Sequence, residues 1–499
     1  MASAPSLGQL EEKIRDISLD ADPDAMRQAG YRVVDWIVAR IEGIRQSTLG
    51  HELSREEAEK LLREDLPEDP AGFDRVFDEF REKVAPNAIQ LDHPRFFAFI
   101  PSAPNYVSVW AEALVAGSNY FAGTWLESSG PSQVELVVVD WFKKILEMPT
   151  AAAGLLVSGG SVANLTALAA ARRSVLNDHV QDAVVYLSDQ THASVDRALR
   201  LLGFASPQFR RIPTDAEYRM DTEALRGAIE QDLKSGLKPF AVIASGGTTN
   251  TGAVDPLKEV AAITREYSMW FHVDAAYGGF AALTERGRKL LEGIGLADSV
   301  VLDPHKWLYC PFEAGCVLVR DSRLLRDTFR IMPEYMHDVA REDHEVNFCD
   351  YGLQLTRSFR ALKVWMAIKT FGARRFREVI DQSMDLAEYA SRLIELSPRL
   401  ALLTRPQLGV FAFRYVPENL PANAAQAESL LERVNQKLQA RILSDRQVMI
   451  SSTRLEGRFV LRFCVLNHRT RKEDVRESVN RIEEMGRSVE DCFDEPSTH

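Results

Sequence analysis

Short, continuous runs of apolar residues alternate with helical patterns through the middle of the chain. Such runs are typical of strands buried on both faces, and a helix between successive strands indicates a mainly parallel sheet. The runs lie at residues 154–157, 183–187, 240–244, 270–273 and 299–302, and another follows at 316–319. We therefore expect a three-layer α/β/α domain with a mostly parallel sheet.

Other patterns flank this sheet domain. Residues 24–45 carry apolar side chains at helical spacing, and residues 54–62 form a second amphipathic helix. Towards the C-terminus, apolar runs with intervening helical patterns predict a smaller α+β domain. The expected divisions are 1–105 for an N-terminal helical segment, 106–376 for the large domain and 377–499 for the small domain. The N-terminal apolar stripe needs a partner surface, either within the chain or on a second subunit.

Composition narrows the class of protein. The chain has 499 residues, of which 45% are hydrophobic and 26% charged, as in ordinary globular proteins. A net charge of -12 without a long basic run argues against non-specific binding to nucleic acid. The sequence predicts neither a bilayer-spanning segment nor a signal peptide. The five cysteines are an odd number without paired metal-ligand spacing, so we expect reduced thiols, a cytoplasmic protein and no metal.

Candidate chemistry follows the predicted strands, because ligands of open α/β sheets bind outside the carboxyl ends of the strands. After the first strand, residues 158–161 read Ser-Gly-Gly-Ser and lead into a helix whose first amides would attract a phosphate. Glycine-rich turns of this kind also occur without a ligand. The third strand leads into the hydroxyl-rich residues 245–252.

Three ionisable side chains follow other strands. His192 stands at a helix start, where a histidine is often only a cap, and Asp274 ends the fourth strand. Lys306 follows the fifth strand, where it is either a partly desolvated nucleophile or an ordinary lysine with its amine in water. Pyridoxal phosphate needs an amine, an anion for its ring nitrogen, a stacking face and a phosphate cup. The four strand ends together predict this cofactor.

The chain resembles the group II pyridoxal-phosphate decarboxylases, in their aromatic L-amino-acid decarboxylase branch. The resemblance covers about residues 24–469 and rests on four motifs, at 93–98, 191–195, 272–277 and 303–307. It implies the fold-type I architecture of the aminotransferases and a homodimer with the active site at the interface. The N-terminal helices would then clasp the second subunit.

The resemblance also implies roles for individual residues. Lys306 would form the Schiff base with the cofactor, Asp274 would pair with the ring nitrogen and His192 would stack on the ring. The other implied cofactor contacts are Gly160, Ser161, Thr249, Ala276 and His305, and the implied substrate pocket contains Leu91, Phe99, Ile100, Pro101 and Ser102. An apolar pocket suits an aromatic amino acid. Tyrosine, phenylalanine, tryptophan and dihydroxyphenylalanine are not ranked by the sequence.

One position departs from the family pattern. The decarboxylases carry a loop tyrosine near the reacting carbon, and we match that position to Phe348, which has no proton to give. The resemblance implies two alternatives. The chain either releases an amine, with His337, His344 or Tyr351 as proton donor, or it is an aldehyde synthase that consumes oxygen and releases aldehyde, ammonia and hydrogen peroxide. An aminotransferase and a non-catalytic cofactor-binding protein are the more distant alternatives.

Overall fold

The computed structural model describes residues 5–100, 102–331 and 345–494, with side chains up to residue 491. It divides into two compact units, Met1–Ile89 and Gln90–His499. The first unit is helical and consists of α1 (Leu7–Glu11), α2 (Pro23–Gly43), α3 (Arg55–Leu62), α4 (Phe73–Glu79) and the short turns η1 (Phe80–Val84) and η2 (Ala85–Asn87). Asp22 caps α2 by accepting hydrogen bonds from the amides of Asp24 and Ala25. The two predicted helices are present here as α2 and α3.

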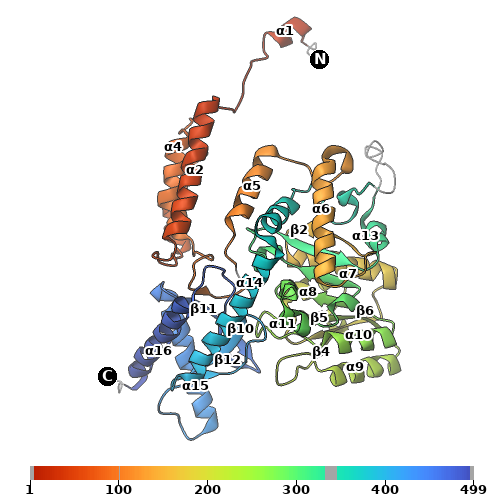
Figure 1. Cartoon of the computed structure of the whole chain (residues 1–499), viewed down its shortest axis with the longest axis vertical. Helices are drawn as coiled ribbons and strands as arrows, with labels where there is room; N and C mark the ends of the chain where they lie inside the picture. Colours follow the sequence, from red (N-terminus) through yellow and green to blue (C-terminus); the bar gives the residue numbers. More distant parts are fainter. Residues whose placement is uncertain (1–4, 101, 332–344, 495–499) are drawn as a thin grey trace. The chain divides into compact units, whose positions relative to one another are not determined.

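A seven-stranded sheet forms the centre of the second unit (Figure 1). Its strands, in spatial order, are β2 (Ala153–Val157), β8 (Gly315–Val319), β7 (Ser299–Leu302), β6 (Trp270–Asp274), β5 (Lys238–Ser245), β3 (Ala183–Ser188) and β4 (Phe209–Ile212). All pairs from β7 to β4 are parallel, and only β8 runs antiparallel to its two neighbours. This confirms the predicted fold class. The edge strand β4 was not predicted, because two of its four residues are arginines.

The sheet is buried on both faces, as its uninterrupted apolar runs predicted. In β5, Val242 and Ala244 join one hydrophobic core, whereas Ala241 and Ile243 join the other. Successive side chains of a strand point to opposite faces, so one short run supplies both cores. The surrounding helices are α5 (Tyr106–Ser118), α6 (Trp125–Ile145), α7 (Gly160–Leu176), α8 (Ala193–Leu201), α9 (Thr222–Lys234), α10 (Leu257–Glu266), α11 (Glu285–Leu290), α12 (Pro304–Trp307) and α13 (Ser322–Phe329), with turns η3 (Ser206–Gln208), η4 (Gly279–Leu283), η5 (Ile294–Leu296) and η7 (Phe348–Asp350).

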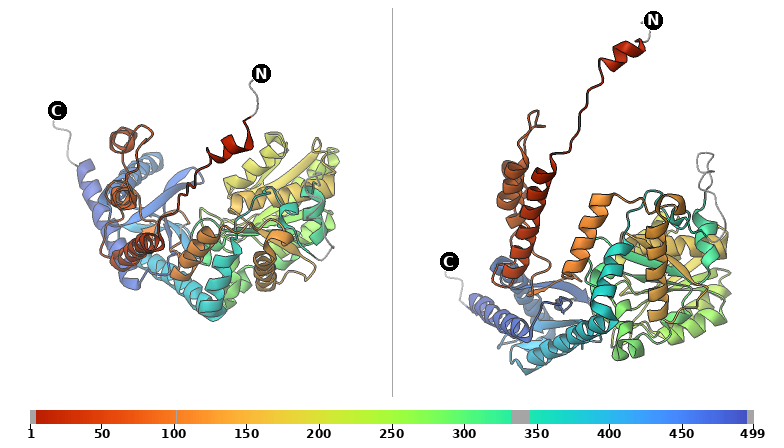
Figure 2. Two further views of the ribbon diagram at one scale, coloured as in Figure 1. Left: turned by 90° about the horizontal axis from the view of Figure 1, so that it is seen from above. Right: turned by 45° about the horizontal axis from the view of Figure 1, so that its top comes forward.

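A second sheet of five strands lies towards the C-terminus (Figure 2). Its order is β1 (Phe96–Phe97), β11 (Met449–Leu455), β12 (Arg458–Cys464), β10 (Val410–Tyr415) and β9 (Leu400–Leu402), and α14 (Ala361–Leu396), α15 (Ala424–Asp445) and α16 (Lys472–Asp494) contribute to its core. Phe97 stacks on Phe463 with ring centroids 4.1 Å apart. Residues from Gln90 onwards therefore belong to the second unit, whereas we had placed residues up to 105 in the N-terminal segment.

Helix α14 joins the two cores of the second unit. Val364 and Ala367 pack in the core of the large sheet, and Ala390 and Ile394 pack in the core of the small sheet. The helix is interrupted at Gly372, whose φ of 74° and ψ of 153° suit only glycine. Among the described residues, none of the helices has the length and hydrophobicity of a membrane span.

The interruption in α14 leads to a stability prediction. Gly372→Ala should lower the free energy of unfolding by about 1–3 kcal/mol, because an alanine side chain is strained at this backbone conformation. No atom lies within 4 Å of the added Cβ in the described chain, so the loss would come from the backbone alone. The measurement is chemical denaturation. Gly227→Ala in α9 is the control, since its Cβ also meets open space and its φ is ordinary, and it should not lose stability. Equal effects of the two substitutions would contradict the strain argument.

Candidate active site

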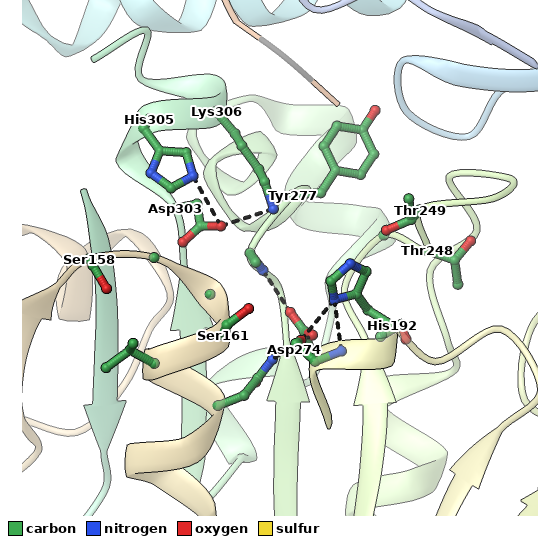
Figure 3. A pocket seen from close by; sticks show the side chains of 18 of the residues that line it. Ser158, Ser161, His192, Thr248, Thr249, Asp274, Tyr277, Asp303, His305 and Lys306 are labelled. Atoms are coloured by element: carbon green, nitrogen blue, oxygen red, sulfur yellow. Dashed lines mark hydrogen bonds and ion pairs between the residues drawn. The ribbon is translucent and has the colours of Figure 1, made fainter. Parts of the chain in front are cut away.

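The carboxyl ends of the parallel strands meet around a cavity of about 330 Å³ (Figure 3). This volume is in the range of small-molecule sites. All eight residues expected to contact a cofactor line the cavity, namely Gly160, Ser161, His192, Thr249, Asp274, Ala276, His305 and Lys306. The cavity also contains residues that the sequence argument did not single out, among them Asn164, Ser194, Tyr277, Asp303 and Glu313.

Lys306 reaches the cavity from the short helix α12 and is paired with Asp303. Its Nζ lies 2.9 Å from Oδ2 of Asp303, and Nε2 of His305 lies 3.5 Å from the same oxygen. Burial raises the pKa of Asp303, but the charges of Lys306 and His305 outweigh burial and hold that pKa below its usual value. The carboxylate therefore holds the lysine amine at one place in the cavity. Asp303 lies one turn before Lys306, which is a signal that the sequence offered and that we missed.

The turn between β2 and α7 is shaped for an anion. Helix α7 has no side-chain cap among the described residues, so its first amides are available to a ligand. A Cβ added at Gly160 would lie 3.1 Å from Oδ2 of Asp303 and 3.2 Å from Cβ of Ala276. One added at Gly159 would lie 3.1 Å from Cε1 of His305. Only glycine leaves this space open beside the helix N-terminus, which fits the phosphate of pyridoxal phosphate.

Asp274 ends β6 with its carboxylate at the cavity and is only 8% exposed. Oδ2 accepts a hydrogen bond of 2.9 Å from Nδ2 of Asn164, and Oδ1 accepts one of 3.2 Å from the amide of Ala276. A buried carboxylate needs such donors or a cation to remain charged. The site therefore offers a buried anion of the kind that the ring nitrogen of pyridoxal phosphate needs.

His192 caps α8 and is held by its own helix. Nδ1 lies 2.7 Å from Oγ of Ser194 and accepts from the amide of the same residue at 3.3 Å. Because Nδ1 is an acceptor, the proton of the neutral ring lies on Nε2. The capping role and the cofactor role that we had treated as alternatives are compatible, since the capped ring lines the cavity.

Thr249 is held by the small sheet. Arg462, on β12, donates to the carbonyl of Thr249 and, at 2.9 Å, to the carbonyl of Asn250. Nη1 of Arg462 also donates to Oγ of Ser451 at 2.7 Å, and Ser451 accepts from the amide of Phe99. The guanidinium is buried, and burial lowers its pKa. The C-terminal sheet thus fixes one wall of the cavity.

The structure places Phe348 away from the cavity of the single chain. Its ring is completely buried in the core beside β2 and α7, and the guanidinium of Arg357 lies 4.9 Å from its centroid. Neither Phe348 nor its neighbour Tyr351 lines the cavity. Residues 332–344, which contain Tyr335, His337 and His344, lie outside the described residues.

The expected substrate residues are not at the cavity either. Leu91 and Phe99 are exposed, Ile100 is partly buried and Ser102 is buried, but none of the four lines the cavity of the single chain. Pro101 lies outside the described residues. Their role in a substrate pocket stays a prediction that depends on a second subunit.

The shape of the glycine turn can be tested directly. Gly160→Ala should weaken the binding of pyridoxal phosphate at least tenfold, because the new methyl group would press on Asp303 and Ala276 and narrow the anion site. Titration of cofactor-free protein, followed by tryptophan fluorescence, measures the affinity. Gly227→Ala is the control and should bind as the unmodified protein does. Unchanged affinity of Gly160→Ala for pyridoxal phosphate would show that the phosphate does not bind at this turn.

Comparisons with known proteins agree with this geometry. The pyridoxal-dependent decarboxylase conserved domain matches residues 56–416. An aromatic-L-amino-acid decarboxylase of Bacillus atrophaeus is 40% identical over 473 residues, which are 95% of this chain and 98% of the relative. A phenylacetaldehyde synthase of Petunia hybrida is 30% identical. The alignment covers 89% of this chain and 90% of the relative. The crystal structure of Oryza sativa TDC with PLP and tryptamine has a TM-score of 0.89 at 29% identity and covers 95% of this chain and all of that one. The chain therefore belongs to the pyridoxal-dependent decarboxylase family, and its cofactor is pyridoxal 5′-phosphate.

Proposed function

We propose that this enzyme decarboxylates an aromatic L-amino acid to the corresponding amine and carbon dioxide, and that it acts as a homodimer. The observation that carries the proposal is the convergence of Lys306, Asp274 and His192 on one cavity beside the glycine turn. The named relatives support the aromatic substrate, since one is an aromatic-L-amino-acid decarboxylase and others are tryptophan and tyrosine decarboxylases.

Each of these three side chains has a distinct task in the proposed reaction. Nζ of Lys306 is the amine that would hold the cofactor covalently. Asp274 would keep the ring nitrogen protonated, and the flat imidazole of His192 would offer the ring a stacking surface. When bound, pyridoxal phosphate withdraws the electron pair that the departing carbon dioxide leaves behind. The fixed carboxylate of Asp274 would keep the ring nitrogen positively charged, so that the ring can take up this electron pair.

Asp303 can balance the positive charge of Lys306. While the lysine is a free ammonium, Oδ2 of Asp303 is its counter-ion at 2.9 Å. Nε2 of His305 lies 3.5 Å from the same oxygen, and its ring is near the glycine turn. The other oxygen, Oδ1, has no hydrogen-bond partner among the described residues. We infer that Asp303 keeps both basic side chains oriented towards the cavity through the cycle.

The amine is favoured over the aldehyde because the argument for an aldehyde synthase depended on Phe348. That ring is completely buried and packs against Arg357, so its missing hydroxyl gives no support to an aldehyde synthase. Aldehyde synthases are nevertheless among the relatives at about 30% identity. The aldehyde remains the second candidate, to be decided by measuring the products.

The homodimer is supported by exposed apolar side chains near the expected substrate segment and in the N-terminal unit. Phe99 is 58% exposed, although its amide is fixed by Ser451, and Tyr31 and Val38 of α2 are exposed as well. Tyr31, Val34 and Val38 recur at helical spacing on α2 and are all exposed, and a contiguous apolar stripe of this kind is typical of a contact surface. A second subunit would also give Leu91 and Phe99 a cavity to line.

Lys306→Ala tests the central proposal. This variant should lose at least 1,000-fold in turnover with every aromatic amino acid, because Lys306 is the only lysine among the described residues that line the cavity. Steady-state release of carbon dioxide is the measurement, and the variant's affinity for free pyridoxal phosphate is measured beside it. Substantial residual turnover would refute the role of Lys306.

Phe348→Tyr tests which product is formed and why. Unmodified enzyme, incubated in air with each aromatic amino acid, should release amine without hydrogen peroxide, and Phe348→Tyr should not alter that ratio because the side chain faces a core. Amine, aldehyde and peroxide are measured together. Stoichiometric peroxide from the unmodified enzyme would establish the aldehyde synthase instead. A shift of the products towards amine in Phe348→Tyr would show that residue 348 faces the reacting carbon.

A further inference from the structure

A continuous series of hydrogen bonds runs beneath the cavity from Trp270 to Asp274 and His192. Nε1 of Trp270 donates to Oγ of Ser299 at 2.9 Å, and Oγ of Ser299 lies 2.7 Å from Nδ1 of His272. Nε2 of His272 lies 2.9 Å from Oδ1 of Asn164. All four of these residues are buried, and His272, Ser299 and Asn164 have no exposed surface.

Asn164 is the branch point of this network. Its Nδ2 donates to Oδ2 of Asp274 at 2.9 Å and to Oγ of Ser194 at 3.0 Å. Ser194 in turn lies 2.7 Å from Nδ1 of His192. One amide group is therefore bonded to the carboxylate below the ring nitrogen and, through one hydroxyl, to the imidazole that lies against the ring.

The direction of each bond follows from the number of hydrogens. Both amide hydrogens of Asn164 are used, so its oxygen accepts, and Nε2 of His272 must be the donor. A neutral imidazole then accepts at Nδ1, which Ser299 satisfies with its hydroxyl hydrogen while its oxygen accepts from Trp270. Burial lowers the pKa of His272 to about 4, although the charge of Asp274 opposes the change, so the ring is neutral at physiological pH. Every group in the network has the partner that it needs.

We propose that Asn164 is a positioning residue that holds Asp274 and His192 in their working orientations, and that His272 and Ser299 fix the orientation of its amide. If the amide were reversed, its oxygen would face the carboxylate of Asp274 and its NH₂ group would face the N–H of His272. Repulsion between the amide oxygen and the carboxylate of Asp274 disfavours that reversal, and a proton on Nε2 of His272 disfavours it further. This inference rests on the proposed cofactor contacts of Asp274 and His192.

The consequence is that one amide couples two contacts with the cofactor. Loss of the amide hydrogens would leave Asp274 with a single backbone donor, from Ala276, and would free the hydroxyl of Ser194 to turn away from His192. Substitution of Ser299, at the far end of the network, should also weaken cofactor binding. The effect should be smaller, because Ser299 acts on Asn164 only through His272.

Asn164→Asp tests the proposal, because an ionised carboxylate keeps the shape of the side chain, donates no hydrogen bond and repels Asp274. We expect its affinity for pyridoxal phosphate to fall about tenfold or more, the change expected when a hydrogen bond to a charged group is lost. The matched control is Asn435→Asp in α15. Asn435 is a fully buried asparagine that forms hydrogen bonds with Tyr415 and Leu431, and none of these three residues lines the cavity. The control should lose stability but keep its affinity within twofold. Equal cofactor affinities of the two variants would overturn the proposal.

The direction of the network is tested without substituting Asn164. In ¹⁵N-histidine spectra of the full-length protein with its cofactor, the His272 resonance, assigned by its absence in His272→Gln, should report a proton on Nε2 and a ring that stays neutral at pH 6. In Ser299→Ala the His272 ring should no longer be restricted to the tautomer with its proton on Nε2. This variant should also weaken cofactor binding, by a smaller factor than Asn164→Asp. A proton on Nδ1, or a ring that titrates near its ordinary value of about 6.5, would overturn the proposal. These measurements do not involve turnover, so failure of decarboxylation leaves them unaffected.

Discussion

The parallel register of β3, β5, β6 and β7 is the constraint on which the site depends. Parallel strands end at a common edge, so residues that are far apart in sequence, such as His192 and Lys306, meet at one cavity. The register is in turn fixed by burial, because each strand supplies alternate side chains to two separate cores. A shift by one residue would send each side chain to the opposite core and disrupt the packing of both. The chemistry is therefore held in place by apolar packing well away from the cavity.

Burial at this edge requires that the polar groups satisfy one another. Asp274, Asp303 and Glu135 are all buried carboxylates of the second unit, and each has a nearby donor or cation. Two of them serve the cavity, whereas Glu135 pairs with Arg357 in the core that contains Phe348. The same rule thus produces both functional and structural ion pairs. Only their position relative to the strand ends distinguishes the two kinds.

Much of the fold and the cofactor site could be predicted because strand ends leave strong local signals. Uninterrupted apolar runs indicated the strands, and the residues after them, such as Asp274 and Lys306, proved to line the cavity. Asn164 left no such signal, since it lies inside a helix and its role depends on His272 from another element. Long-range pairing of this kind is absent from local patterns. The helical face that carries Asn164 could be predicted, but its partners could not.

Phe348 shows the limit of reasoning from aligned motifs in loops. Its match to a family tyrosine depended on counting back from residues 357–360, and a loop tolerates insertions that break such counting. The structure places the ring against Arg357, where a phenyl face attracts a guanidinium and a hydroxyl is not required. A core phenylalanine and an active-site phenylalanine look identical in sequence. Burial distinguishes them, and in this chain burial removes the reason to expect oxygen chemistry from this position.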